Sequence, residues 1–389
     1  MPLIKTLTGQ FAKIKVIGVG GGGNNAINSM ISEESIQGVE FIAVNTDSQA
    51  LLNSLADIKI QIGEKLTKGL GAGGNPVMGQ EAAKESTERI KEVLEGTDMV
   101  FITGGMGGGT CTGAAPIIAQ IAKKELNILT IAVVTKPFLF EGTRRMTNAE
   151  EGISLLRDNV DTLIVIPNQK VMEVVNDKVT LLEAFKIADS VLNKGTKAIA
   201  DLITTPGLIN LDFADIKSVM SNAGSALMGV GEAEGPNKAK KAVLSAIDSP
   251  LVDVNIQGAR GVLINITGGP DLTMAEIEES ARTITEHTAP DANIIFGASI
   301  DPNVKDKIKI SVIATGFDSS RARIFQTKKI INSPPPVDSV SQSQTSDDIA
   351  QSGQVSEKEI KDILGDNEVP AGIDIVDKYD IPAFLRKNK

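Results

Sequence analysis

The sequence has very few of the residues that build covalent crosslinks, metal sites and histidine-dependent catalysis. Its 389 residues contain one cysteine, one histidine, one tyrosine and no tryptophan. A single cysteine excludes an intrachain disulfide. The only histidine, His287, lies in the polar stretch ARTITEHTAP and is interpreted as a solvated residue at a helix end. We therefore expect neither a zinc site of Cys and His ligands nor a Ser-His-Asp triad.

Long apolar runs and an excess of positive charge are also missing. The formal net charge is −10, whereas a protein that binds nucleic acid through its phosphates needs a basic face. No apolar run approaches the roughly 20 residues that span a bilayer. The first ten residues, MPLIKTLTGQ, lack the apolar core of a signal peptide. The sequence thus predicts a cytoplasmic protein with no nucleic-acid partner and no direct insertion into a membrane.

Short apolar runs alternate with amphipathic helical patterns through the first half of the chain. Buried parallel strands are nearly continuous apolar runs, and their alternation with helices indicates a doubly wound, Rossmann-like α/β domain. The expected strands are residues 13–19, 39–44, 99–103, 129–134 and 163–166, and the expected helices are residues 25–32, 79–94 and 112–126.

A second, smaller α/β domain is expected after one long central helix. That helix is predicted over residues 179–203 and is ended by Pro206 and Gly207. Its apolar residues wrap most of its circumference, which is typical of a helix buried between two domains. The elements expected beyond it are helices at 215–222 and 271–287 and strands at 261–267, 293–299 and 307–315.

The composition changes near the C-terminus. Ser, Gln and Pro fill 14 of the 26 positions from 333 to 358, which predicts disorder. Apolar residues return at the end of the chain in DIPAFLRK, which favours a docking peptide on a flexible tether. The predicted organisation is a flexible N-terminus (1–12), a first domain (13–178), the central helix (179–205), a second domain (206–321), a disordered linker (322–368) and the docking peptide (369–389).

Three glycine-rich loops punctuate the first domain: GVGGGGNN (18–25), GLGAGGNP (69–76) and GGMGGGTCTG (104–113). The loop at 18–25 satisfies the G-x-G-x-x-G pattern. Taken by itself, with Asp47 as a ribose ligand, it would suit a dinucleotide. Structural turns would explain one such loop but not three. Loops at the strand ends of one sheet converge on one crevice, where their backbone N–H groups suit a polyphosphate. Because no G-x-x-x-x-G-K-[ST] motif is present, the preferred interpretation is a mononucleotide triphosphate held by backbone dipoles.

The loop at 104–113 contains the most specific motif. GGGTCTG at 107–113 is similar to the GGGTGTG signature of the tubulin/FtsZ GTPase family. The resemblance covers residues 13–320 almost continuously and the last dozen residues. The stretches that resemble the bacterial FtsZ branch of that family are GVGGGGNNAIN, VNTD, GLGAGGNP, TKPFLFEGTRR, LITTPGLINLDFAD and the terminal DIPAFLRK.

The resemblance implies a Mg²⁺-dependent GTPase that binds GTP and GDP and forms head-to-tail filaments of the bacterial division ring at mid-cell. It implies that the chain's partners are further copies of itself and membrane-tethering or regulatory division proteins that bind residues 380–387. The residues that it implies for the nucleotide are Gly20, Gly21, Gly22, Gly23, Asn24, Asn25, Gly71, Ala72, Gly73, Gly107, Gly108, Gly109, Thr110, Cys111, Thr112, Glu141, Arg145, Asn168, Phe185 and Asp189.

Within this set the resemblance assigns different parts of the nucleotide to different residues. The glycine loops hold the phosphates, with residues 71–73 near the γ end, and Glu141 and Arg145 contact ribose and phosphate. Asn168, Phe185 and Asp189 recognise the base. A carboxylate can accept both N–H donors of guanine, and Phe185 can pack on its ring, although Phe185 also fits a core position of the long helix.

One residue departs from the family pattern, because Cys111 stands where the signature has glycine. A Cβ here is expected to crowd the phosphates or to require a backbone angle that glycine adopts freely. An exposed thiol would also make the activity sensitive to oxidants. On this interpretation, Cys111→Gly tightens GTP binding or speeds turnover.

The stretch NLDFAD after the long helix supplies Asn210, Asp212 and Asp215. One explanation is structural, with Asp212 as a helix N-cap and Asp215 in the first turn. The other is catalytic. About 25 helical residues at 1.5 Å each separate the two ends of the long helix by roughly 37 Å, so these groups cannot reach their own nucleotide. If they are catalytic, they must act on a neighbour's nucleotide. Combined with the resemblance, this distance predicts that all three act on the nucleotide of the next subunit and that hydrolysis is coupled to polymerisation.

Two other functions remain open from the sequence. A nicotinamide-dependent oxidoreductase would use the first glycine loop, but no proton-transfer partner is evident and NLDFAD has no role in it. A structural filament that does not hydrolyse GTP would follow if Cys111 abolished activity.

The C-terminal peptide generates the first prediction. A tether of about 45 residues has a root-mean-square reach of roughly 35–40 Å, enough for DIPAFLRK to bind a membrane-anchored adaptor while the filament stays soluble. Deleting residues 380–389 is expected to leave GTP-dependent sedimentation unchanged and to abolish recruitment of a fluorescent fusion to the division site. Continued recruitment of the truncated chain would show that another segment binds the adaptor.

Overall fold

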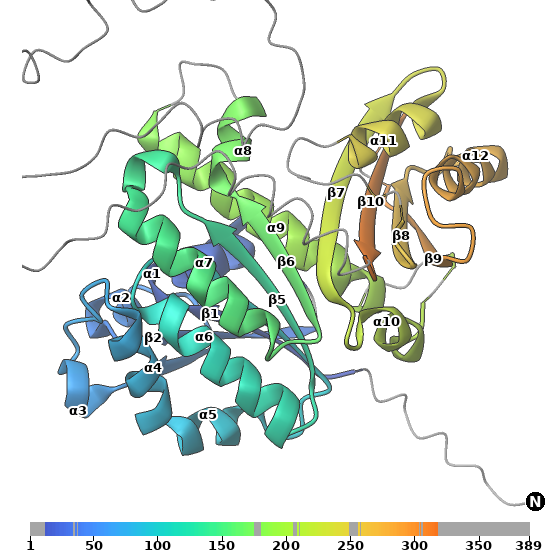
Figure 1. Cartoon of the computed structure of the whole chain (residues 1–389). Coiled ribbons are helices and arrows are strands. Elements are labelled where there is room, and N and C mark those ends of the chain that lie inside the picture. The colour runs from blue at the N-terminus through green and yellow to red at the C-terminus, as the bar shows by residue number, and fades with distance from the viewer. Residues whose placement is uncertain are drawn as a thin grey trace, which may run out of the picture. The chain divides into compact units, whose positions relative to one another are not determined.

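The computed structural model in Figure 1 describes residues 12–33, 36, 38–174, 180–204, 208–209, 211–248, 256, 258–302, 304 and 306–317. Within these residues, ten strands form one sheet in the order β3-β2-β1-β4-β5-β6-β7-β10-β8-β9. The predicted linker and docking peptide lie outside the described residues, as do Pro206 and Gly207 and all but the last residue of the N-terminal segment.

The first six strands are all parallel and follow the 3-2-1-4-5-6 order of a Rossmann sheet. The doubly wound fold predicted from the alternating apolar runs is therefore confirmed. These strands are β1 Ile14–Val19, β2 Val39–Asn45, β3 Ile58–Gln61, β4 Met99–Gly105, β5 Leu129–Lys136 and β6 Thr162–Pro167.

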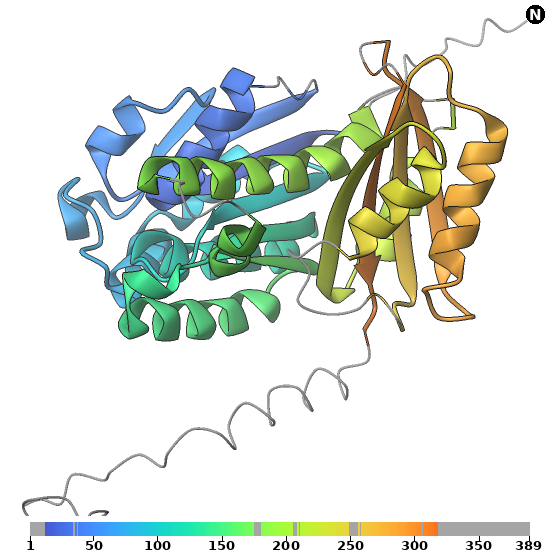
Figure 2. The ribbon, with the colours of Figure 1, turned by 90° about the horizontal axis from the view of Figure 1, so that it is seen from above.

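Helices cover both faces of this parallel sheet. Successive residues of β4 point to opposite faces, so Phe101 lies in one apolar cluster and Ile102 in the other. The first face packs against α1 (Gly20–Glu33) and α9 (Leu181–Thr204), and Figure 2 shows α9 extending along the sheet toward β7. The second face packs against α4 (Pro76–Glu85), α5 (Thr87–Leu94), α6 (Thr110–Gln120) and α7 (Thr143–Arg157).

Short elements connect these helices and strands. They are α2 (Ser48–Leu52), α3 (Glu64–Thr67), the π-helix η1 (Ile121–Glu125), the 3₁₀-helix η2 (Leu139–Glu141) and α8 (Asn168–Val174).

The second part of the sheet is mixed rather than parallel. β7 (Gly224–Glu234) pairs with β6 through three residues and then runs antiparallel to β10 (Lys307–Thr315). β8 (Gly261–Gly268) is antiparallel to β10 and parallel to β9 (Asn293–Ile300). The smaller α/β domain predicted from the sequence is thus present, with its own apolar cluster. Its helices are α10 (Phe213–Met220), α11 (Lys238–Ile247) and α12 (Met274–Thr285).

Several predicted helices have different limits. The first begins at Gly20 inside the glycine loop, not at residue 25. Residues 79–94 form two helices, α4 and α5, because the chain breaks helical geometry at Ser86. The helix predicted at 112–126 starts earlier and ends in the π-helix η1. In the described part of the chain no helix has both the length and the apolarity needed to cross a membrane.

Strand β7 escaped prediction because its two central glycines suggest a loop. The structure explains these glycines by close packing of α11. A Cβ on Gly229 would lie 1.8 Å from the carbonyl oxygen of Ala246, and one on Gly231 would lie 2.0 Å from that of Ala242. Tertiary contact, not local preference, requires glycine here.

This packing gives a prediction for stability. Gly231→Ala forces β7 and α11 apart, and overpacking of this kind lowers the free energy of unfolding by about 1–3 kcal/mol. Urea unfolding followed by circular dichroism is expected to shift to a lower midpoint. Ser225→Ala, at an exposed position of the same strand, is the matched control and should leave the midpoint unchanged. Equal midpoints for the two variants would contradict the close contact.

Candidate functional site

A cleft with a volume of about 330 Å³ lies at the carboxyl ends of β1, β4, β5 and β6. The chain leaves β1 for α1 on one face of the sheet and leaves β4 for α6 on the other, so the cleft lies at a topological switch point. It is lined by Val19, Gly20, Gly21, Gly22, Asn25, Gly105, Met106, Gly108, Gly109, Thr110, Cys111, Thr135, Pro137, Glu141, Arg145, Asn168, Phe185, Ala188, Asp189 and Leu192.

Glycines from two helix N-termini form the floor of this cleft. α1 starts within the glycine loop at 18–25 and α6 within the glycine loop at 104–113. A Cβ built on Gly21 or Gly108 meets no atom within 4 Å, so any side chain there would enter open space. The unpaired N–H groups of two helix N-termini therefore face one crevice, and this arrangement attracts anions such as phosphates.

Several predicted site residues support the glycine loops from behind instead of lining the cleft. Asn24 is 2% exposed, and its amide donates to the carbonyls of Gly18 and Gly20 and accepts from Asn45. Thr112 is also buried, and its Oγ1 accepts a 2.9 Å hydrogen bond from the backbone N–H of Gly107.

Gly23 and Gly107, two further predicted site residues, are packed against the backbone of neighbouring segments. A Cβ on Gly23 would lie 2.6 Å from the carbonyl oxygen of Thr103, and one on Gly107 would lie 2.7 Å from that of Arg145. Gly107 also has a φ of +102°, which favours glycine. Gly23, Asn24, Gly107 and Thr112 thus shape the loops without lining the cleft.

The glycine loop at 69–76 lies beside the one at 104–113 but does not line the cleft. Gly71 has a φ of +85°, and its N–H donates to the carbonyl oxygen of Thr46 over 3.3 Å. The methyl of Ala72 lies so close to Gly109 that a Cβ on Gly109 would be 2.8 Å away. Gly71, Ala72 and Gly73 therefore form a rim next to the phosphate end of the cleft.

The opposite end of the cleft has an aromatic side chain and an unsatisfied acceptor. Asn168 is 6% exposed, and its Oδ1 has no hydrogen-bond partner among the described residues. Phe185 is 40% exposed and meets Phe138 edge to face, with ring centroids 5.3 Å apart. Asp189 follows Phe185 by one turn of α9, so both side chains lie on the same helix face. A flat base with N–H donors suits these groups.

Glu141 and Arg145 also line the cleft. Glu141 accepts a 3.0 Å hydrogen bond from the backbone N–H of Phe138 and forms an ion pair with Arg145. The Glu141 side chain is largely buried, whereas Arg145 is 57% exposed. The guanidinium therefore has N–H donors available for a further acceptor in the cleft.

Two expectations for Cys111 were wrong: that its thiol is exposed, and that its backbone needs an angle that favours glycine. Cys111 is 4% exposed and lies in an apolar cluster, and its backbone is helical, without the positive φ that glycine favours. Its sulfur packs against Gly104, where a Cβ would lie 2.5 Å from Sγ. The thiol is therefore part of the core, and Cys111 also contributes to the lining of the cleft.

The acidic groups of NLDFAD are far from this cleft. Asp212 is the exposed N-cap of α10 and accepts a 2.7 Å hydrogen bond from the N–H of Asp215, which is also exposed. Asn210 lies outside the described residues. α9 has 24 residues between the two regions, a length of about 36 Å. Figure 1 shows α10 at the end of α9 remote from α8, which begins with Asn168.

Some cleft residues had not been identified from the sequence. Ala188 and Leu192 are on the same face of α9 as Phe185 and Asp189, and their helical spacing was the available signal. Thr135 is the penultimate residue of β5 and Pro137 directly follows the strand, where the strand order predicts a contribution to the crevice. Across the described ranges no group of three or more His, Cys, Asp or Glu could hold a metal ion.

Comparisons with known proteins agree with this geometry. The model of the tubulin/FtsZ family GTPase domain matches residues 13–176, and that of the FtsZ family C-terminal domain matches residues 224–318. A mutant of FtsZ from M. jannaschii is 51% identical over 79% of this chain and 92% of that chain, with a TM-score of 0.76. An empty FtsZ dimer from M. jannaschii is 50% identical over 80% of this chain and 90% of that chain, also with a TM-score of 0.76.

A more distant structure shares the fold alone. CetZ2 from Haloferax volcanii, solved as a protofilament with bound GTPγS, is 18% identical over 82% of this chain and 98% of that chain, with a TM-score of 0.68.

The environment of Cys111 predicts slow thiol chemistry. Burial raises the pKa of the Cys111 thiol from 9.0 to about 12. We expect reaction with a disulfide reagent at pH 8 to be slow in the native chain and fast in urea, measured by absorbance. Because only the unfolded chain loses this proton between pH 9 and 12, the thiol's contribution to stability is complete below about pH 9 and declines above it. Fast labelling of the native chain would contradict burial.

Proposed function

The chain belongs to the tubulin/FtsZ family, and on that premise we propose that it hydrolyses GTP at a site completed by a second copy of itself. The observation that carries this proposal is the distance between the cleft and the acids of α10 within one chain. The glycine-lined cleft lies at one end of α9, and the exposed acids of α10 follow the other end. One chain thus contains both halves of a hydrolytic site but cannot bring them together.

The cleft supports GTP as the substrate. Its volume of about 330 Å³ lies within the range of ligand pockets. The N-termini of α1 and α6 suit the phosphates, and Arg145 adds positive charge beside them. Asp189 can accept from N1–H and N2–H of guanine, while the orphaned Oδ1 of Asn168 can accept a further donor. Adenine lacks this pair of donors, so we propose a preference for GTP over ATP.

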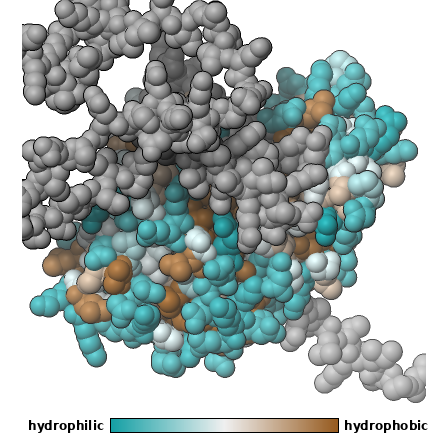
Figure 3. Space-filling model, viewed as in Figure 1, coloured by the Kyte–Doolittle hydropathy of each residue, from teal (hydrophilic) through white to brown (hydrophobic). Residues whose placement is uncertain are grey.

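Exposed apolar side chains support head-to-tail contact. Near the cleft, Leu70 is 85%, Leu139 67% and Phe140 62% exposed, and beyond the far end of α9 Leu208 is 68% exposed. Figure 3 shows apolar patches scattered over a mainly hydrophilic face. Contact between unlike ends is heterologous and propagates into an open filament. The dimer and protofilament known for relatives are consistent with such contacts.

The proposed hydrolysis places the acids of one copy against the γ-phosphate bound by the next. Asp212 and Asp215 orient and polarise a water that attacks phosphorus in line, and the bond to the β–γ bridging oxygen breaks to give GDP and phosphate. The amides of the glycine loops stabilise the developing charge. Mg²⁺ supplies charge neutralisation when bound, and its ligands would be chiefly phosphate oxygens and water. Asn210 is proposed to join this acidic group.

The sequence left two alternative functions open, an oxidoreductase and a filament that does not hydrolyse GTP. A nicotinamide-dependent oxidoreductase does not agree with the family to which the chain belongs. A filament without hydrolysis was motivated by Cys111, but the buried thiol gives no reason for lost activity. We propose that the filament belongs to a division ring in the cytoplasm at mid-cell, with adaptors bound by the C-terminal peptide. The bacterial assignment stays a prediction.

The shared site predicts a specific loss in Asp212→Asn. Asparagine caps a helix as well as aspartate does, so α10 should be retained while the negative charge is removed. We expect phosphate release from GTP to fall at least tenfold, with unchanged binding of a fluorescent GTP analogue. Wild-type turnover per molecule should rise with protein concentration and should be far lower with ATP.

Asp158→Asn is the matched control, because Asp158 is an exposed carboxylate at the C-terminal end of α7 and does not line the cleft. It should keep wild-type turnover. Normal, concentration-independent hydrolysis by Asp212→Asn would refute the shared site. Concentration-independent hydrolysis by the wild type would refute it as well.

A further inference from the structure

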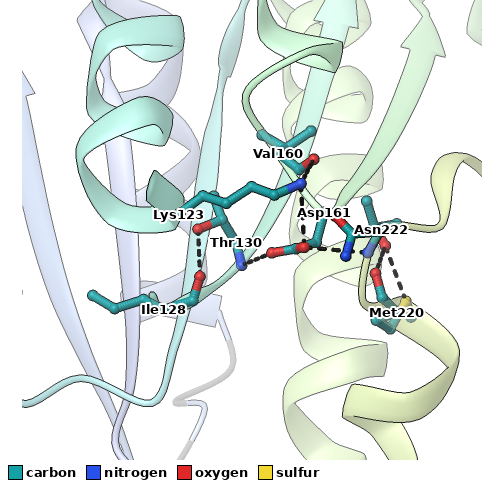
Figure 4. Close-up of polar contacts among 8 residues, drawn as sticks. Lys123, Ile128, Thr130, Val160, Asp161, Met220 and Asn222 are labelled. Carbon is teal, nitrogen blue, oxygen red and sulfur yellow. Dashed lines mark hydrogen bonds and ion pairs between the residues drawn. The ribbon is translucent and has the colours of Figure 1, made fainter. Parts of the chain in front are cut away.

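Asp161 is a buried carboxylate that the proposed mechanism does not use. It immediately precedes β6, is 7% exposed, and has both oxygens engaged (Figure 4). Oδ2 accepts a 2.9 Å hydrogen bond from the N–H of Thr130 at the start of β5, and Oδ1 accepts a 3.2 Å bond from the N–H of Asn222. Nζ of Lys123 lies 3.3 Å from Oδ1 and donates to the carbonyl of Val160.

The contacts of Asp161 and its neighbour hold the C-terminal end of α10. Asn222 lies two residues after that helix with a φ of +51°, a conformation that asparagine tolerates and that is needed here for the turn. Oγ1 of Thr162 donates over 2.6 Å to the carbonyl of Met220, the last residue of α10. The N–H of Gly224 donates to the carbonyl of Asp161 over 2.9 Å. The parallel sheet thus holds the end of α10 and the start of β7 at one point.

Two other aspartates occupy equivalent positions and make a useful comparison. Asp57 precedes β3 and accepts from the N–H of Phe41, and Asp98 precedes β4 and accepts from the N–H of Lys13. Each joins neighbouring strands at the amino end of the sheet, and both are exposed. Asp161 makes the same strand-to-strand bond, but its second oxygen holds the turn after α10. This added contact to the turn after α10 distinguishes Asp161 from Asp57 and Asp98.

We propose that Asp161 is a positioning residue for GTP hydrolysis, acting through α10 on the nucleotide of the next copy and never touching nucleotide itself. The inference rests on the shared site proposed above. α10 has eight residues, a length of about 12 Å, with its anchor at one end and Asp212 and Asp215 at the other. Loss of the anchor lets the helix tilt, and a displacement of about 1 Å at the acids can cost 100-fold in rate.

The first test is a comparison of Asp161→Ala with Asp98→Ala in the full chain. Both variants lose a carboxylate that bonds to a neighbouring strand, but only Asp161→Ala loses the contact to the turn after α10. We expect Asp161→Ala to lower kcat roughly 10- to 100-fold with unchanged binding of a fluorescent GTP analogue. Asp98→Ala should keep wild-type kcat. Equal values of kcat for the two variants would overturn the proposal.

Asp161→Leu serves if Asp161→Ala does not fold. Leucine keeps the branched shape of the side chain but can accept from neither backbone N–H group, so the bonds to Thr130 and Asn222 are both lost. The Asp98→Leu variant is then the control. A kcat of Asp161→Leu equal to that of Asp98→Leu would overturn the proposal.

The second test asks which half of the shared site fails. Gly21→Leu places a side chain in the cleft and should abolish GTP binding, but it leaves the variant's own α10 intact. In a mixture, Gly21→Leu supplies correctly placed acids, and Asp161→Ala supplies a cleft that still binds GTP. We therefore expect the mixture to release phosphate faster than either variant alone. A merely structural defect in Asp161→Ala would weaken its own cleft and give no recovery.

A mixture of Gly21→Leu with Asp212→Asn distinguishes failure of the positioning role of Asp161 from failure of the shared site. Recovery there, but none with Asp161→Ala, would overturn the positioning role and leave the shared site standing. No recovery in either mixture would overturn the shared site and the inference that rests on it. Recovery in both supports both.

Discussion

The rigid length of α9 is the constraint on which the proposed function depends. A helix of 24 residues does not bend back on itself, so groups at its two ends, about 36 Å apart, cannot meet within one chain. The cleft gathers Phe185 and Asp189 from its first turns, whereas α10 begins after its last. The cleft and the acidic groups therefore lie on different surfaces, and the proposed mechanism needs another copy to unite them.

Glycine serves two physical purposes in this fold. Gly21 and Gly108 face open space, so the backbone itself forms the surface offered to a ligand. Gly23 and Gly231 face neighbouring backbone at distances that no Cβ could occupy, so they allow helices and loops to pack closely. The first kind makes the site and the second holds it in place. Cys111 belongs with the packing residues, since its sulfur lies against Gly104 within the core.

The two parts of the sheet depend on a narrow connection. β7 pairs with β6 over only three residues, and polar contacts of Asp161 and Thr162 secure the adjoining end of α10. Asp57 and Asp98 make a simpler version of this contact, in which a carboxylate joins two strands at the amino end of the sheet. At Asp161 the carboxylate has a second partner outside the parallel sheet, so the acids of α10 are mounted on the domain that binds nucleotide.

The sequence by itself determined the doubly wound domain, the long helix and the glycine loops, because apolar periodicity and loop chemistry are local properties. It also located both ends of the cleft, from the glycine loops to Phe185 and Asp189. Tertiary structure decided the rest. It revealed β7, whose glycines are explained by α11, and it buried Cys111, whose sulfur packs against Gly104. It also separated Gly21, which faces the cleft, from Gly23 and Asn24, which support it. These distinctions depend on contacts between distant segments, which no local pattern records.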